Sequence, residues 1–180
     1  MKEIRIHGRG GQGSVTAAEL IAQAAFYGGQ FAQAFPNFGV ERRGAPVTAF
    51  ARLDNKFIRR RSQIYEPDYI IIQDATLVDG VDVFWGAQKG TVALINTEKP
   101  KSDFKAPIGV KIITVPATKI AIDIIGKPII NTVLLGAFAA LSGLINLLAV
   151  ERAINERFEG EIAKKNIAAA RKGFGEIQNI

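Results

Sequence analysis

The sequence predicts an α/β fold, a three-layer αβα domain built on a mixed, mostly parallel sheet with an inserted β-hairpin. Two observations support this fold. Short apolar runs alternate along the chain with longer segments whose apolar residues recur at helical spacing, which is the order of βαβ units. One region departs from that order with an alternating run and a polar turn, which is typical of a hairpin. No repeat or linker divides the 180 residues, so we expect one domain over residues 1–180.

The chain begins with a strand that runs into a glycine loop. Ile4 and Ile6 alternate with polar residues, and the loop Gly8–Gly13 follows directly. A helix is expected after this loop, because apolar residues recur at helical spacing until Gly28 and its glycine neighbour end it. A second strand is expected near residues 30–35.

The predicted hairpin comes next. Residues 47–53 alternate like a half-buried strand, and the polar residues 54–56 are typical of a turn. We expect residues 57–61 to form the second, antiparallel strand of this hairpin.

The remainder of the chain returns to alternating strands and helices. Compact apolar runs at 69–74, 91–96 and 111–115 are typical of buried parallel strands. The expected helices run from Pro116 to Gly126, from an N-cap at Asn131 to Gly143, from about Val150 to a stop at Gly160, and from about Glu161 to Gly173.

One apolar run raises the alternative of a membrane span. The segment from Ile129 to Val150 carries no charge and is long enough to cross a bilayer. Because Asn131 and Gly143 have the character of helix boundaries, we expect instead a buried or interface helix and no membrane span.

Composition restricts the chemistry of the chain. It has no cysteine, which excludes disulfides and thiolate ligation of zinc or an iron–sulfur cluster, and His7 is its one histidine. This composition disfavours side-chain catalysis by this chain alone. The net charge of +6 favours an anionic partner. No leader segment opens the sequence, so we expect a cytoplasmic protein.

The glycine loop is the first candidate site, and its spacing fits G-x-G-x-x-G. Either its backbone N–H groups bind an anion at a helix N-terminus, or its glycines only allow a tight turn and close packing. A stand-alone NAD(P)- or other nucleotide-binding protein is the alternative function. A dinucleotide site needs an acid about 20 residues on, whereas the first acid after the second strand is Glu41. The candidate residues are Gly8, Arg9, Gly10, Gly11, Gln12 and Gly13.

A second candidate follows the second strand, with Glu41, Arg42, Arg43 and Gly44. We expect this loop near the glycine loop, at the carboxyl edge of the sheet where ligands of α/β proteins bind. One arginine could pair with Glu41 while the other binds an anion, or the loop could simply be solvated. The run Arg59–Arg61 is expected to be an exposed face or the rim of an interface, and without stacking aromatics it does not indicate nucleic-acid binding.

Taken together, Gly8–Gly13 and Phe38–Pro46 closely resemble the gamma subunits of the 2-oxoacid:ferredoxin oxidoreductase family, in the form of its pyruvate:ferredoxin oxidoreductase (pyruvate synthase) branch. The 2-oxoglutarate branch usually lacks the double arginine. The resemblance covers nearly the whole chain and continues through Tyr65–Asp68, Asn96–Lys99, Asn131–Ala137 and Asn166–Ala170, which adds Asn131 to the candidate residues.

The resemblance implies an enzyme that is divided among subunits. It would convert pyruvate to acetyl-CoA, or the reverse, with thiamine diphosphate and magnesium on alpha and beta subunits and coenzyme A as co-substrate. Iron–sulfur clusters on partner subunits, a delta-type subunit among the partners, would pass electrons to ferredoxin. This chain would be structural, with no catalytic residue, no metal and no bound cofactor of its own. Arg42, Arg43 and the glycine loop would face the junction through which coenzyme A approaches.

Overall fold

The computed structural model describes residues 1–37 and 43–179, and these form a six-stranded mixed sheet in the order β2-β3-β1-β4-β5-β6. The pairs β1–β4, β4–β5 and β5–β6 are parallel, and β3 is antiparallel to both β1 and β2. The expected α/β class with a mixed, mostly parallel sheet is confirmed. The strands are β1 (Lys2–Arg9), β2 (Phe31–Pro36), β3 (Pro46–Asp54), β4 (Tyr69–Ile72), β5 (Val92–Asn96) and β6 (Lys111–Val115).

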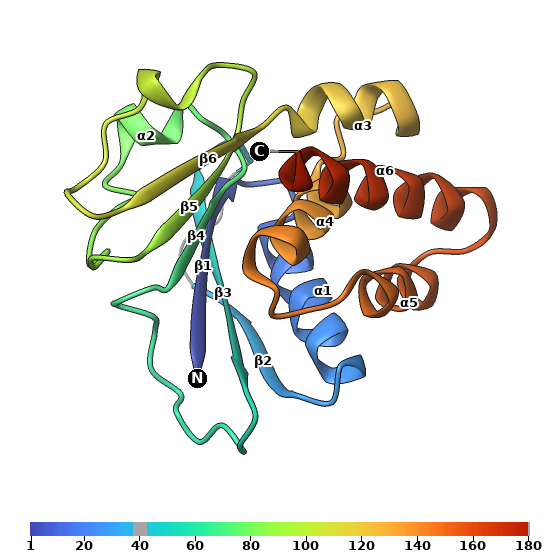
Figure 1. Ribbon diagram of the computed structural model, residues 1–180, viewed down its shortest axis with the longest axis horizontal. Helices are drawn as coiled ribbons and strands as arrows, with labels where there is room; N and C mark the ends of the chain where they lie inside the picture. Colours follow the sequence, from blue (N-terminus) through green and yellow to red (C-terminus); the bar gives the residue numbers. More distant parts are fainter. Residues whose placement is uncertain (38–42, 180) are drawn as a thin grey trace.

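Most of the helices cover one face of the sheet (Figure 1). The main core lies between these helices and the sheet, because every second side chain of the strands, such as Ile4 and Ile6 on β1, points to that face. These helices are α1 (Ser14–Tyr27), α3 (Ala117–Ile125), α4 (Asn131–Ser142), α5 (Leu147–Arg157) and α6 (Gly160–Gln178).

The opposite face has a thinner cover. The short helix α2 (Leu77–Gly80), the 3₁₀ turn η1 (Lys101–Asp103) and irregular segments form that layer, and a second core cluster around Ile70, Ile72 and Leu77 lies beneath it. Figure 1 shows α2 on the side of the sheet away from the large helices.

The first strand of the predicted hairpin is confirmed as β3, but its predicted pairing with residues 57–61 is wrong. Strand β3 pairs with β2 on one edge and with β1 on the other, so neither edge is left for residues 57–61. That segment has no strand structure. It is held by side chains instead. Gln33 donates to the carbonyl of Ile58 at 3.1 Å, and the fully buried Arg52 guanidinium donates to the carbonyl of Arg60 at 3.5 Å. Arg52 also holds the residues that follow, Ser62 (2.6 Å) and Gln63 (3.2 Å), by their carbonyl oxygens and pairs with Glu3 at 2.7 Å.

Three predicted helix boundaries also need correction. Asn131 is the first residue of α4 rather than its cap, and Ile130 precedes it. Gly160 begins α6 instead of closing α5, which ends at Arg157. Helix α6 continues through Gly173 to Gln178, because Gly173 lies at the close contact with α4 and does not end the helix.

The uncharged run from Ile129 to Val150 is a core element. It divides into α4, a turn at Gly143 and the start of α5, and residues Thr132–Ala139 of α4 are all buried, largely against α6. Among the described residues, no helix combines the length and the apolar character that crossing a bilayer requires.

Candidate functional site at the carboxyl edge of the sheet

The glycine loop joins the end of β1 to the first turn of α1. Gly11 and Gly13 have φ of +95° and +75°, a backbone region that favours glycine. The loop is closed on itself, because the N–H of Gln12 donates to the carbonyl of Arg9 at 2.9 Å and the Gln12 Oε1 accepts from the N–H of Arg9 at 2.8 Å. The sequence spacing therefore corresponds to a tight turn that opens a helix.

Two glycines of the loop allow close packing by polar side chains. A Cβ at Gly8 would overlap Gln73 Oε1 and Ser14 Oγ, and a Cβ at Gly13 would overlap Asn131 Nδ2. Gly11 has no neighbour within 4 Å of such an atom. Close packing thus accounts for Gly8 and Gly13, whereas Gly11 faces open space.

The structure brings the second candidate loop to the first. Gly10 donates its N–H to the carbonyl of Ala45 at 2.8 Å, and Gly44 donates to the carbonyl of Gly10 at 3.0 Å. Arg43 and Gly44 are exposed. The remaining two candidates of this loop, Glu41 and Arg42, lie outside the described residues.

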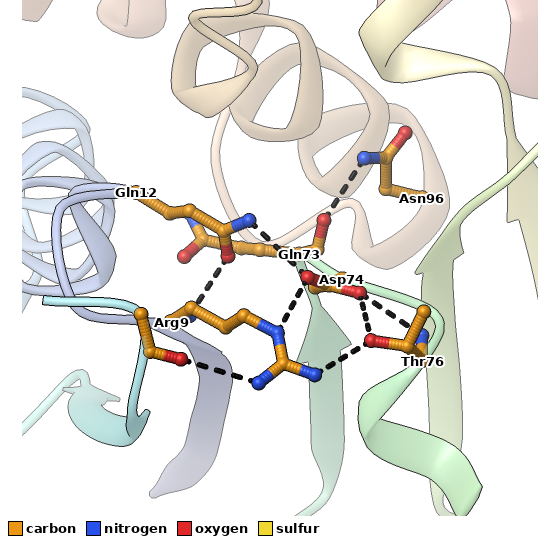
Figure 2. Close-up of polar contacts among 7 residues, drawn as sticks. Arg9, Gln12, Gln73, Asp74, Thr76 and Asn96 are labelled. Atoms are coloured by element: carbon orange, nitrogen blue, oxygen red, sulfur yellow. Dashed lines mark hydrogen bonds and ion pairs between the residues drawn. The ribbon is translucent and has the colours of Figure 1, made fainter.

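Arg9 ties three segments together at this edge (Figure 2). Its guanidinium pairs with Asp74 Oδ2 at 2.8 Å and also donates to Thr76 Oγ1 at 2.7 Å and to the carbonyl of Gly44 at 3.2 Å. Burial opposes the charged form of Asp74, but the hydrogen bonds from Thr76 and Arg9 outweigh it and hold the pKa of that carboxyl below its ordinary value. Arg9 is thus committed to an internal ion pair that fixes the two loops against the end of β4.

A chain of neutral amides continues across the ends of β4 and β5. Gln73 accepts from Ser14 Oγ at 2.6 Å and donates to Asn131 Oδ1 at 2.9 Å. The Asn96 amide donates to the carbonyl of Gln73 at 2.9 Å (Figure 2) and accepts from the N–H of Thr118 at 3.0 Å. These contacts fix the start of α1, α3 and α4 relative to one another.

A hollow of about 570 Å³ opens above these amides. The glycine loop forms one wall, residues 128–131 form another, and every lining side chain is uncharged. Gly13, the residue before α1, lines this hollow, as do the amide side chains of Gln73 and Asn96. The arrangement offers hydrogen-bond donors and shape, and its lining supplies no acid or base for proton transfer.

His7 lies on the opposite face of the sheet from this hollow, in a small pocket with Arg5. Its Nε2 accepts from Arg5 Nε at 3.1 Å. Burial, together with the positive charge of Arg5, lowers the pKa of His7 from 6.5 to about 3. The imidazole is therefore neutral near pH 7 and acts as a buried acceptor. The described residues hold no group of three or more side chains suited to bind a metal ion.

The chain matches a known protein family. Residues 3–176 match the family described as pyruvate ferredoxin/flavodoxin oxidoreductase. The chain belongs to this family. Its expected resemblance is confirmed, since the family covers nearly the entire chain.

Individual relatives match over nearly their full length. The chain is 52% identical to pyruvate synthase subunit PorC of Methanocaldococcus jannaschii over 177 residues, which cover 98% of this chain and 97% of the relative. It is 52% identical to the pyruvate/ketoisovalerate oxidoreductases common subunit gamma of Thermococcus litoralis, covering 97% and 96%. The crystal structure of pyruvate oxidoreductase subunit PORC from Thermotoga maritima superposes with a TM-score of 0.86 at 35% identity, covering 97% of this chain and 95% of that one.

Sequence reasoning missed the polar residues that organise this edge in the family member described here. Gln73 and Asp74 are the two residues after β4, and Asn96 is the last residue of β5, at the end where parallel strands present residues to a site. That position, polar residues at the end of an Ile- or Leu-rich run, is the signal that could have found them.

Proposed function

We propose that this chain is the gamma subunit of a multi-subunit pyruvate:ferredoxin oxidoreductase, which oxidatively decarboxylates pyruvate to acetyl-CoA or runs the reverse reaction. The observation that carries the proposal is the 52% identity over 97–98% of both chains to a subunit named for pyruvate synthase. One relative is named as the gamma subunit common to pyruvate and ketoisovalerate oxidoreductases. By analogy, this chain would also serve an oxidoreductase that acts on a second 2-oxoacid.

In this proposal the chemistry takes place on partner chains. Thiamine diphosphate and magnesium would be held by alpha and beta subunits, and iron–sulfur clusters on partners that include a delta-type subunit would carry electrons to ferredoxin. The composition of this chain supports that division, because it has no cysteine to ligate a cluster and its one histidine is buried and neutral near pH 7. The complex would be cytoplasmic, and residues 1–180 would act in it as one domain.

The carboxyl edge is the part of the chain that we assign to the junction with those partners. The paired loops at Gly10 and Gly44, the exposed Arg43 and the neighbouring Arg42 would line the approach of coenzyme A, whose phosphates are anionic. Arg9 would hold the two loops in place through Asp74 without contacting the ligand itself.

Reconstitution of the complex tests the function. A tagged copy of this chain, expressed with its partner subunits, should co-purify with thiamine- and cluster-binding chains and show coenzyme A-dependent reduction of ferredoxin by pyruvate. Purification of the chain without such partners, or pyruvate oxidation by the chain alone, would contradict the proposal.

The double variant Arg42→Ala/Arg43→Ala tests the assigned edge. We expect weaker assembly or a higher KM for coenzyme A, with the KM for pyruvate unchanged in the assembled fraction. Replacing the exposed Lys105 and Lys165, which lie on other elements, removes the same charge and serves as the control. Identical assembly and coenzyme A kinetics in both double variants would refute the role of the arginines.

A further inference from the structure

Strand β2 is at one end of the sheet, and among the described residues its only strand partner is β3. The direction of its backbone groups follows from one hydrogen bond. The N–H of Asn37 donates to the carbonyl of Thr48 at 2.9 Å, one step beyond the last registered pair, Pro36 with Ala49. Asn37 with Thr48 is therefore a hydrogen-bonded pair of the antiparallel ladder.

Hydrogen-bonded and non-hydrogen-bonded pairs alternate along such a ladder. Ala32, Ala34 and Pro36 fall on the non-hydrogen-bonded positions, so their backbone groups point away from β3. The outer edge consequently offers the N–H groups of Ala32 and Ala34 and the carbonyls of all three residues. Pro36 has no N–H, but its backbone points outward, so the β2–β3 ladder loses no hydrogen bond.

This edge has little of the protection that exposed strands usually carry. Edge strands commonly bear charged side chains that discourage pairing with another chain. The sequence of β2 is Phe-Ala-Gln-Ala-Phe-Pro and contains no charge. Apart from the proline at its end, the strand is suited to accept another strand.

A groove of about 720 Å³ runs along β2. One side is formed by residues 32–36, and the other by Arg60, Arg61 and Gln63. The two arginines are exposed. Arg60 pairs with Glu3 at 3.5 Å through one guanidinium nitrogen, and Arg61 makes no ion pair with any described residue. The groove therefore combines a row of backbone donors and acceptors with a wall of positive charge.

The arginine wall is held at a fixed distance from β2. Gln33 of β2 donates its side-chain amide to the carbonyl of Ile58 at 3.1 Å, and the buried Arg52 holds Ser62 and Gln63 by their carbonyls. These bonds fix the backbone on both sides of the arginines. An incoming strand would thus meet a prepared groove rather than a loose loop.

We propose that an extended, acidic segment of a partner subunit adds to β2 as a further strand, with its carboxylates on Arg60 and Arg61. The inference rests on the proposed function, in which this chain works inside a complex. Backbone pairing would supply affinity, and side-chain charge would select the segment. A second copy of this chain is disfavoured as the occupant, because symmetric pairing through β2 would bring the two arginine walls together.

The alternation of β2 also predicts the pattern of the partner. Side chains of Gln33 and Phe35 lie on the face that carries the arginine segment, whereas Ala32 and Ala34 pack toward the helices. Because neighbouring strands share this alternation, the added strand would place acids on the first face and small or apolar residues on the second.

Hydrogen exchange on the complete complex tests the proposal. Peptides that cover residues 31–36 should exchange at least about tenfold more slowly in the complex than in the isolated chain, since the outward amides become paired. Protection in the isolated chain that rises with its concentration would instead indicate a second copy as the occupant and would overturn the proposal.

Two pairs of variants separate pairing from charge. Ala34→Pro removes one outward N–H and should weaken assembly about tenfold, while Ala34→Ser keeps the N–H and should not. Arg60→Glu/Arg61→Glu should weaken assembly about 100-fold, whereas Lys105→Glu/Lys165→Glu changes net charge equally and should have little effect. Circular dichroism confirms that each variant is folded before assembly is measured.

The outcomes distinguish this inference from the proposed function. Absence of any complex with the wild-type chain would remove both. Normal assembly with unchanged exchange over residues 31–36, or equal effects of the arginine and lysine variants, would overturn the added strand alone. Binding of single-stranded RNA that depends on Arg60 and Arg61, without protection of β2 in the complex, would also overturn it.

Discussion

Helices α4 and α6 approach each other closely at Gly136 of α4 and Gly173 of α6. Substitutions at Gly173, with Gly175 as a comparison site outside the contact, test how this domain is packed. Helix α6 contains Gly173 and Gly175, which differ by only two positions. A Cβ at Gly173 would collide with the backbone carbonyl of Val133 on α4, whereas a Cβ at Gly175 would have no neighbour within 4 Å. The same change, Gly→Ala, is therefore expected to have opposite effects at the two sites.

The magnitudes follow from two terms. Alanine is favoured over glycine inside a helix by up to about 1 kcal/mol, and both variants gain this. Overpacking a core contact costs about 1–3 kcal/mol, and the upper end applies at Gly173 because a helical carbonyl, unlike a side chain, cannot rotate away. Gly173→Ala should thus destabilise by about 2 kcal/mol and Gly175→Ala stabilise by up to about 1 kcal/mol.

Thermal unfolding followed by circular dichroism measures the difference. For a chain of this size, Tm should fall by about 4–8 °C in Gly173→Ala and rise by about 2–4 °C in Gly175→Ala. Equal shifts of the same sign would refute the reasoning, because they would mean that helix propensity alone decides both sites. Gly136→Ala, which meets the carbonyl of Ala170 from the other helix, should behave like Gly173→Ala.

Three further predictions concern buried polar groups. Arg52→Met should destabilise the chain by about 3 kcal/mol in urea unfolding, because it removes the nearer partner of Glu3 at 2.7 Å and leaves only the pair with the exposed Arg60 at 3.5 Å. It should also speed tryptic cleavage after the exposed Arg60, whose carbonyl Arg52 holds, and unchanged cleavage would contradict this tethering role. Thr132→Val should cost about 1–3 kcal/mol, since it removes the hydroxyl that donates to the buried Asn166 Oδ1 at 2.9 Å, and a neutral result would show that another donor replaces it. His7 has a folded pKa of about 3 and binds a proton near pH 6.5 only when unfolded, so its contribution is complete above pH 6.5 and is lost as pH falls, by up to about 1.4 kcal/mol per pH unit. Urea unfolding at pH 7 and pH 5.5 should show this loss in the wild type and not in His7→Gln, and parallel losses in both would rule out His7 as its source.

Part of the site at the carboxyl edge of the sheet could be predicted from sequence, because its signals lie within short stretches of the chain. The glycine spacing after β1 identified a turn that opens a helix, and the polar residues after apolar strands are local signals of the same kind. The use of Gly8 and Gly13 could not be predicted, because Gln73 and Asn131, which occupy the space of their missing side chains, are distant in sequence.

Periodicity predicted the order of the six strands and five long helices of this protein, since a strand or helix is decided largely by the spacing of its own apolar residues. The tertiary structure decided which edges pair. Residues 57–61 have the alternation of a strand, yet β1 and β2 occupy both edges of β3. Side chains of Arg52 and Gln33 hold residues 57–61 instead, through the carbonyls of Arg60 and Ile58. In the same way Asn131 has the character of a cap, but its side chain bonds Gln73 across the sheet edge. Segments distant in sequence compete for the same hydrogen-bonding partners only in the folded chain. The spacing of residues within one segment therefore cannot predict which of them pairs.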